Sequence, residues 1–518
     1  MIKDYGPDNT LDWTAIDHEG LYQIEATVRN TFTGEIATAT VDFEMQSLVK
    51  DGQPVITPTS HPLVFLYSAP ACPAGSRMAV QFTSSDKVVQ YTPFQTCRSG
   101  LSMNFYLGGL RAQTQYLVRH KVDTGSAFEE GPILSLTTPE ARSDLPAQKV
   151  LLEPSSKSGI LLQAGIASNP MATDLNGNII WYYPGDLDFN LAGPFLLLSP
   201  DRGGYFWGVI QNNKGDQSQQ ILRQFDLTGR TVIETNAARV GEQLAVMGKR
   251  PIGAFHHEAR RLPDGKIAVL ASVEQIFTDF QGPDPVDVLG DMIVILDGNL
   301  QVVWAWDGFD HLDVKRLSTT NDRCPFGGCP PLFLAPAAID WLHANSVEQT
   351  PDGNLVLSSR HQDWVIKVDY RNGEGSGQVL WRLGKDGDFQ FNSTDPYPWF
   401  SHQHDAKFLP DNETIILFDN GNLRNLADRS ANSRGQVIHL DEGNRIATLV
   451  LNADLGVYSA ALGSAQSLLD GNYHFNAGVL SDASSRAIEI NPSGQPVYEL
   501  EIHAPQYRTF RMNDIYTP

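Results

Sequence analysis

Charged side chains, long apolar runs and positive charge are all scarce in this sequence of 518 residues. Asp, Glu, Lys and Arg make up only 19% of it, and no apolar run approaches the roughly 18 residues that a membrane-spanning helix needs. The formal net charge of −22 disfavours binding to nucleic-acid phosphates and to anionic membranes. We therefore expect a soluble globular protein without membrane insertion or a nucleic-acid partner, in which local cations hold any anionic substrate.

Cysteine is also scarce, with four residues that fall into two spaced pairs, Cys72 with Cys97 and Cys324 with Cys329. Neither pair has the Cys-x-x-Cys spacing of common zinc sites, so we expect no zinc there. The spacing favours the two pairs as disulfides of an oxidising compartment, and the alternative is four buried thiols in a cytosolic protein. The first five residues have no apolar core of the kind that a signal peptide carries.

Turn-forming residues, by contrast, are abundant, with 44 glycines and 31 prolines, as all-β folds require. Residues 1–50 contain two stretches in which apolar and polar side chains alternate around a Thr-Gly-Glu turn. They predict a hairpin with one buried face, part of a β-sandwich module. Residues 58–139 loosely resemble a fibronectin type III β-sandwich, and a linker follows.

Residues 149–518 contain a repeat made of an apolar strand, an Asp or Asn with a glycine turn, and a strand that often carries tryptophan. It occurs six times, with turn residues at 174, 226, 297, 369, 441 and 491. The copies are therefore 52, 71, 72, 72 and 50 residues apart. Hairpin repeats of this size are typical of propeller blades, so we predict a six-bladed β-propeller over this range.

Three repeats carry a polar residue at one shared position. His257, Asn345 and His404 each stand seven residues before the aspartate of a turn, and His343 lies two residues before Asn345. A fourth copy has Gly463 there. Because equivalent strand positions converge on the channel of a propeller, we expect these side chains to meet at its mouth. Strand alternation predicts that His343 and Asn345 point the same way. Taken singly, three neighbouring histidines are predicted to lie in the core or on the surface: His256, His361 and His402.

Arg360 ends the strand that follows His343 and Asn345, so one hairpin offers an imidazole, an amide and a guanidinium. This combination suits a bound anion, and neutral imidazole is a good nucleophile near pH 7. Three histidines could instead bind zinc or iron, but a neighbouring arginine would repel a dication. We prefer transfer of an anionic group to histidine without a metal or other cofactor. A catalytically silent propeller that binds an anionic ligand or a protein partner is the alternative.

The motifs Asp-Trp-x-His-x-Asn-Ser, Ser-Ser-Arg-His-Gln, His-His-Glu and Gln-His-Asp resemble those of the bacterial arylsulfate sulfotransferases, which do not use the nucleotide donor PAPS. The resemblance implies a six-bladed propeller behind a β-sandwich, a periplasmic or secreted location and no cofactor. It also implies aryl sulfates and phenols as substrates, joined by a ping-pong mechanism through a sulfohistidine; hydrolysis by water is the alternative. Some family members are dimers, so a homodimer is considered as well.

Matched residue by residue, the resemblance makes His404 the sulfated nucleophile, with His257, His343 and Arg360 as its catalytic companions. Asn345 matches an asparagine near the sulfate. Three aromatic residues flank the motifs and are predicted to stack on the aryl ring, with packing in the core as the alternative: Phe255, Trp341 and Phe400.

Overall fold

A computed structural model describes residues 2–6, 9–11, 13, 19–154, 158–166, 168–185, 196–210, 217–280, 283–329 and 335–518. These residues form 38 β-strands and very little helix, so the predicted all-β fold class is confirmed. No helix in this described part is long and apolar enough to cross a membrane. The helices are α1 (Ala237–Val246), α2 (Gly308–His311), α3 (Asn422–Ala427), η1 (Gln217–Gln219) and η2 (Arg371–Gly373).

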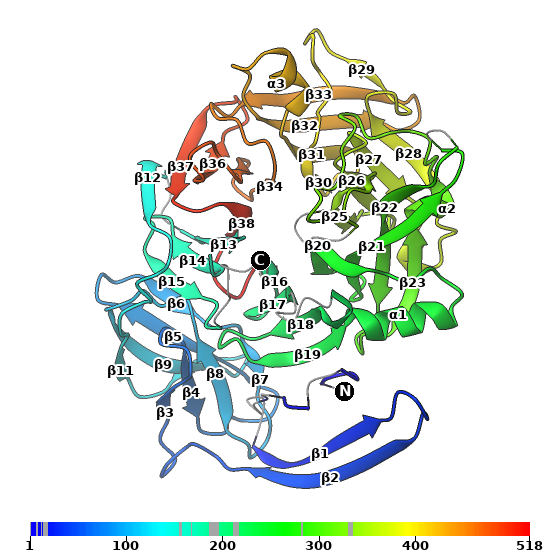
Figure 1. Cartoon of the computed structure of the whole chain (residues 1–518). Helices are drawn as coiled ribbons and strands as arrows, with labels where there is room; N and C mark the ends of the chain where they lie inside the picture. The colour runs from blue at the N-terminus through cyan, green and yellow to red at the C-terminus, as the bar shows by residue number, and fades with distance from the viewer. Residues whose placement is uncertain are drawn as a thin grey trace.

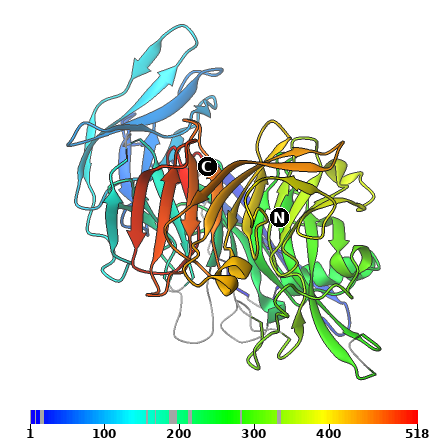
Figure 2. The ribbon, with the colours of Figure 1, turned by 90° about the horizontal axis from the view of Figure 1, so that it is seen from above.

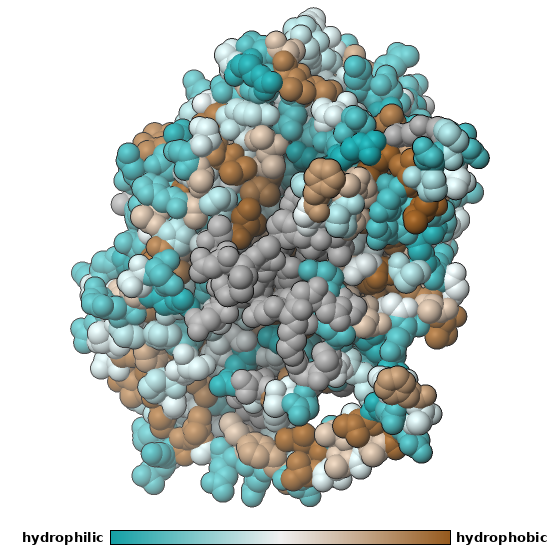
Figure 3. All heavy atoms as spheres, in the orientation of Figure 1, coloured by the Kyte–Doolittle hydropathy of each residue, from teal (hydrophilic) through white to brown (hydrophobic). Residues whose placement is uncertain are grey.

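The N-terminal hairpin consists of β1 (Gly20–Arg29) and β2 (Ile36–Met45), which pair antiparallel along their whole length. The predicted hairpin is confirmed, but the predicted burial of its apolar face is wrong. Val28, Val41 and Phe43 are 67%, 61% and 45% exposed, and apolar side chains gather along this lower edge of the molecule (Figure 3). Among the described residues before Val55, no other strand is available to cover this face.

The next region forms two sheets and holds the predicted disulfide Cys72–Cys97. It stands beside the rest of the molecule (Figure 2) and shares a buried core with it. The backbone N–H of Gly108 donates to the hydroxyl of Tyr516, which in turn donates to the carbonyl of Tyr106, both at 2.8 Å. One sheet contains β3 (Val55–Pro58), β4 (Phe65–Ala69) and β8 (Met103–Leu107); the other contains β5 (Arg77–Ser84), β6 (Val89–Tyr91), β7 (Gln95–Thr96), β9 (Gln115–Asp123), β10 (Phe128–Glu130) and β11 (Leu134–Thr137).

The remaining strands form six sheets of four or five strands. In chain order, the first combines β13 (Ile160–Gly165), β14 (Met171–Asp174) and β15 (Ile179–Tyr182) with the last strand, β38 (Gln506–Met512). The second holds β16 (Leu196–Asp201), β17 (Tyr205–Ile210), β18 (Ile221–Phe225) and β19 (Thr231–Asn236). The third holds β20 (Ala254–Arg261), β21 (Ile267–Phe277), β22 (Val286–Leu296), β23 (Val302–Asp307) and β24 (Ile339–Asp340).

The fourth sheet holds β25 (Ala344–Gln349), β26 (Leu355–Ser359), β27 (Trp364–Val368) and β28 (Val379–Gly384). The fifth holds β29 (Gln390–Asn392), β30 (His404–Phe408), β31 (Thr414–Asp419), β32 (Arg434–Asp441) and β33 (Ile446–Asp454). The sixth holds β34 (Ser464–Ser467), β35 (Tyr473–Ala477), β36 (Ser485–Ile490), β37 (Pro496–Ile502) and, paired with β37, the early strand β12 (Gln148–Leu152).

The six sheets surround a common centre (Figure 1). Strands β16, β20, β25, β30 and β34 contact one another in this order, and β38 and β13 complete the circuit. The first and last strands of this region close the circuit, because β38 pairs with β13 and β12 pairs with β37. Six sheets around one centre are the arrangement expected of a propeller, and the count of six blades stays a prediction. The strands that carry the three sequence motifs are thus neighbours at the centre.

Candidate active site

Each strand that carries a motif is interrupted by a shift in its pairing register. The shift lies between His256 and Ala259 on β20, between Ala344 and Ser346 on β25, and between His404 and Lys407 on β30. Such bulges twist a strand and redirect its side chains, and they are frequent beside active sites.

The backbone is also left-handed at four positions near these bulges, with φ values of 52° at His257, 48° at His343, 53° at His402 and 57° at Asp405. For residues other than glycine this conformation costs on the order of 1–3 kcal/mol, and it clusters at functional sites. It also breaks strand alternation. The left-handed φ at His343 departs from the extended geometry on which strand alternation rests, and the side chains of His343 and Asn345 contact different partners.

The imidazole rings form a continuous row. The ring centroids of His257 and His343 lie 4.9 Å apart, and those of His343 and His361 lie 4.5 Å apart. His256 extends the row at one end, 4.9 Å from His257, and His402 extends it at the other, 5.6 Å from His361. His256, His361 and His402, which sequence patterns assigned singly to packing or surface roles, are thus direct neighbours of the candidate catalytic histidines.

His404 starts β30 and is 2% exposed. Its Nδ1 lies 2.6 Å from Oδ1 of Asn420, the residue that follows β31. Burial lowers the pKa of His404 well below its ordinary value, and the charge of Arg360 lowers it further. The ring is therefore neutral near pH 7 and close enough to feel the guanidinium of Arg360.

Arg360 ends the hairpin of β25 and β26, as the sequence predicts. Its guanidinium donates to Nε2 of His361 and, at 3.2 Å, to the carbonyl oxygen of Ala460. A guanidinium has five N–H donors, so these two contacts leave capacity for an anion. Arg360 is near enough to the nucleophile candidate, His404, for its charge to lower the pKa of that ring.

His343 and His257 differ in their partners. Nδ1 of His343 lies 2.7 Å from Oδ2 of Asp340. Burial would raise the pKa of Asp340, but His343 and His361 offset it and bring this pKa down to about 2. Asp340 is therefore a carboxylate that can stabilise an imidazolium at His343.

Nδ1 of His257 instead lies 2.8 Å from Nδ1 of His256, whose Nε2 is 3.0 Å from Oδ1 of Asp291. Burial, followed by the charge of His343, lowers the pKa of His257 well below its ordinary value. His257 is therefore a neutral ring that can donate or accept a hydrogen bond.

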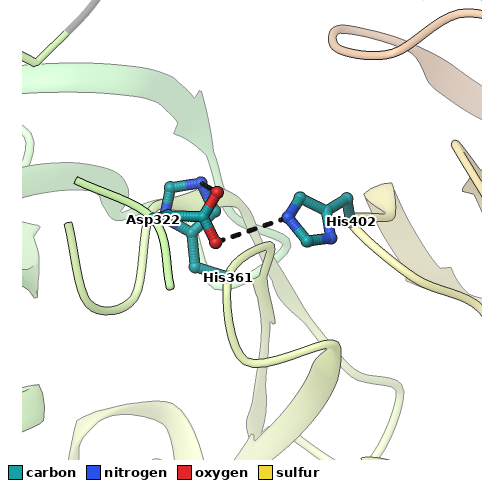
Figure 4. A group of neighbouring side chains, drawn as sticks. All are labelled: Asp322, His361 and His402. Carbon is teal, nitrogen blue, oxygen red and sulfur yellow. Dashed lines mark ion pairs between the residues drawn. The ribbon is translucent and has the colours of Figure 1, made fainter. Parts of the chain in front are cut away.

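Asp322, His361 and His402 form a group whose ligand atoms lie within 4.8 Å of one another (Figure 4). The group does not fit a metal well, because Arg360 donates to the very nitrogen of His361 that would bind it. Burial would lower the pKa of His402, but Asp322 and Asp363 raise it above its ordinary value. The group is better described as a carboxylate–imidazolium network beside the site, and the expectation of no metal stays a prediction.

Asn345 is fully buried, and its amide is occupied by the protein. Its Nδ2 donates to the carbonyl of Gln403 at 2.7 Å, and its Oδ1 accepts from the backbone N–H of Asp405 at 3.2 Å. These two bonds are made to the residues immediately before and after His404. Asn345, predicted to contact the sulfate, therefore fixes the strand that carries the nucleophile candidate.

The three aromatic residues predicted to stack on a substrate lie in the core. Phe255, Trp341 and Phe400 are 0%, 1% and 1% exposed. Trp341 stacks on Phe309 with centroids 5.2 Å apart, and its Nε1 donates to the carbonyl of Arg316. All three side chains are buried in the core, which is the alternative that the sequence left open, and stacking on a substrate stays a prediction.

Arg508 on β38 is a central residue that the sequence analysis missed. It is 2% exposed. Its Nη1 donates to Oε2 of Glu258 and its Nη2 to the carbonyl of Asn345, both at 2.6 Å. Nη2 also lies 3.7 Å from Oδ1 of Asp405. No motif surrounds Arg508, and only closure of the circuit by the last strand brings it beneath the site.

An open cavity lies elsewhere on the described surface, lined by side chains that include His311, Arg316, Trp364, Arg382 and Arg445. None of the four candidate catalytic residues lines it. Arg382 is held by Asp388 at 2.8 Å, and Arg316 covers the face of Trp364 at 4.0 Å. We therefore take the row of histidines, and not this cavity, as the candidate site.

Comparisons with known proteins address the family. The family model described as Arylsulfotransferase (ASST) matches residues 137–511, which is most of the chain. A comparison with curated proteins finds no significant match. Similar solved structures include a virginiamycin B lyase from Staphylococcus aureus, 10% identical with a TM-score of 0.32, covering 68% of this chain and 88% of the lyase. A streptogramin B lyase is also 10% identical with a TM-score of 0.32, covering 75% of this chain and 89% of that one. Likenesses this weak carry no argument about chemistry.

Proposed function

Since the chain belongs to the arylsulfotransferase family, we propose that it moves a sulfuryl group from an aryl sulfate to a phenol through a covalent sulfohistidine on His404. One observation carries this proposal. A buried, neutral imidazole lies beside the charge of Arg360 and within electrostatic reach of His343. A silent binding protein would need the cation but not a nucleophile kept unprotonated.

In the first half-reaction, Nε2 of His404 attacks sulfur. The nitrogen–sulfur bond forms as the bond from sulfur to the aryl oxygen breaks. Arg360 binds sulfuryl oxygens through paired N–H groups. The departing oxygen takes a proton from His343, whose imidazolium is stabilised by Asp340 at 2.7 Å. His257, whose pKa is lowered, stays neutral and orients the substrate by hydrogen bonding.

The second half-reaction runs the same steps backwards with a phenol. The phenol gives its proton to His343 and attacks sulfur, the nitrogen–sulfur bond breaks, and His404 returns to its neutral form. Protons balance over the cycle, so no cofactor is required. Attack by water in place of the phenol would make the protein an aryl sulfate hydrolase.

The location of the protein is part of the proposal. Both predicted disulfides form, Cys72–Cys97 and Cys324–Cys329, and disulfides persist in oxidising compartments. They support a periplasmic or secreted protein. The homodimer stays a prediction.

Turnover of a chromogenic aryl sulfate, with and without added phenol, tests the proposed function. We expect slow release of the chromogenic phenol from donor alone, strong acceleration by the acceptor, and formation of the acceptor's sulfate. Equal rates with and without acceptor, with inorganic sulfate as product, would identify a hydrolase. No release under any condition would leave the silent binding protein as the better description.

A further inference from the structure

Asn420 determines which nitrogen of His404 carries the proton. Its Nδ2 donates to the carbonyl oxygens of Ser459 at 2.8 Å and Leu462 at 3.0 Å. Because carbonyl oxygens can only accept, the amide nitrogen must point to them, and Oδ1 must face the ring. Oδ1 lies 2.6 Å from Nδ1 of His404 and can likewise only accept. Nδ1 therefore carries the hydrogen, and Nε2 carries the lone pair.

The surroundings fix this amide in place. Asn420 is fully buried. Its own carbonyl oxygen accepts from the hydroxyl of Ser433 at 3.0 Å, and that hydroxyl accepts from the backbone N–H of Ser459 at 2.9 Å. The backbone of Asn420 is thus held by Ser433, and its amide nitrogen is held by Ser459 and Leu462 in the loop before β34. The side chain cannot turn over without losing two hydrogen bonds.

The amide beside His404 contrasts with the partners of three histidines in the row. His343 has the carboxylate of Asp340 at 2.7 Å, His402 has that of Asp363 at 3.1 Å, and His256 has that of Asp291 at 3.0 Å. A carboxylate stabilises a protonated ring and can accept its proton. An amide oxygen does neither to a comparable extent.

We propose that Asn420 is a positioning residue of the sulfuryl transfer, which keeps the Nδ1 proton on His404 through both half-reactions. This inference rests on the proposed function and deepens it. In the first half-reaction the neutral ring attacks through Nε2, and the product carries sulfur on Nε2 and hydrogen on Nδ1. In the second, the bond from Nε2 to sulfur breaks and a neutral imidazole leaves. Had Nδ1 lost its proton, the leaving group would be imidazolate, a far stronger base and a much poorer leaving group.

The variant Asn420→Asp separates this role from a structural one, because it keeps the shape and changes the charge. We expect two effects. A carboxylate at Nδ1 raises the pKa of His404, so the acidic limb of the pH profile of kcat/KM moves to higher pH. It also draws the Nδ1 proton from the sulfated ring, so transfer to the phenol slows on the order of 100-fold more than formation of the sulfuryl-enzyme.

The measurement mixes enzyme with donor alone, follows the burst of released phenol, and then adds acceptor. The sulfuryl-enzyme is detected by intact mass, and Asn425→Asp serves as the matched control. Asn425 is a buried asparagine on α3 that donates to the carbonyl of Ala431 at 3.0 Å and to none of the histidines. An Asn420→Asp enzyme with wild-type pH profile and wild-type ratio of the two rates would overturn the proposal.

The wild-type protein provides a second test that needs no folded variant at position 420. Nitrogen-15 shifts of labelled histidine distinguish the two neutral tautomers, and the His404→Gln spectrum identifies the resonances of His404 among the 13 histidines. We expect hydrogen on Nδ1, and hydrogen on Nε2 would overturn the inference. If wild type forms no sulfuryl-enzyme at all, the proposed function fails instead, and the tautomer measurement still reports on Asn420 separately.

Discussion

His257 on β20 and His404 on β30 hold the same position in their repeats, yet their surroundings differ. Each stands seven residues before the aspartate of its turn. Nδ1 of His257 meets a second imidazole, His256, whereas Nδ1 of His404 meets the amide of Asn420. Burial lowers the pKa of both rings, but the next cause is His343 for His257 and Arg360 for His404.

The shared position in the repeat places both rings near the centre, and the side chains around each ring determine its hydrogen bonds and its electrostatic surroundings. Both rings are neutral near pH 7, so protonation alone does not select a nucleophile. We propose that the neighbouring cation does, because Arg360 lowers the pKa of His404 and can bind the oxygens of a sulfuryl group. Four experiments test the proposed roles of these two rings and of their neighbours.

Replacement of the proposed nucleophile should have the largest effect. We expect His404→Ala to lose turnover with every donor, on the order of 10⁴–10⁶-fold, because no covalent intermediate can form. His257→Ala, which changes the equivalent position, should keep measurable turnover with donors whose phenol is acidic. After brief mixing of wild type with donor, peptide mapping should find one sulfuryl group on the peptide that contains His404. A sulfuryl group on His257 would identify His257, and not His404, as the nucleophile.

The effect of weakening the proposed proton donor, His343, should depend on the leaving group. In Asp340→Asn the carboxylate that stabilises the imidazolium of His343 is gone, while the size of the side chain is kept. We expect a loss of about 10²–10⁴-fold with donors whose phenol is a weak acid, and a smaller loss with activated donors. The slope of log kcat/KM against the pKa of the phenol measures this. The same slope in the variant and in wild type would exclude His343 as the acid.

Removal of Arg508 should lower the stability of the protein. This side chain links the two strands that carry His257 and His404, because it bonds Glu258 on β20 and lies near Asp405 on β30. Arg508→Met leaves a buried carboxylate without its partner, which typically costs about 3–5 kcal/mol. The matched control is Arg486→Met, whose side chain is 28% exposed and pairs with Glu499, and its effect should stay within about 1 kcal/mol. Urea unfolding measures both. Equal midpoints would show that Arg508 contributes no more than a surface ion pair.

Sequence patterns predict the parts of this molecule that are local. The seven-residue spacing identifies His257 and His404, the turn after Pro351 predicts the hairpin of β25 and β26, and the cysteine spacing predicts both disulfides. Patterns fail where distant segments meet. Arg508 is 250 residues from Glu258, and only closure of the circuit joins them.

The bulges were equally invisible to the sequence analysis. The left-handed φ values at His257, His343 and Asp405 depart from the extended geometry that strand alternation assumes, and no sequence pattern predicts them. Burial beside a motif is also hard to predict from sequence. Phe255 is fully buried, and nothing in the sequence distinguishes an apolar residue packed in the core from one that contacts a substrate.

The last prediction compares how His404 and His402, two residues before it, change the free energy of unfolding with pH. Asp322 and Asp363 raise the pKa of His402, so its stabilising contribution is complete below the unfolded pKa of about 6.5 and is lost as pH rises through the folded value. Burial lowers the pKa of His404, so its unfolded ring binds the proton more readily, and its contribution grows as pH rises toward about 6.5.

In urea unfolding, the stability difference between wild type and His402→Gln should therefore shrink above pH 6.5. The difference between wild type and His404→Gln should shift in favour of wild type from pH 5 to 6.5. Each slope is bounded by about 1.4 kcal/mol per pH unit for one proton. Slopes of the same sign in the two variants would contradict the assignment of one charged and one neutral imidazole to this short segment.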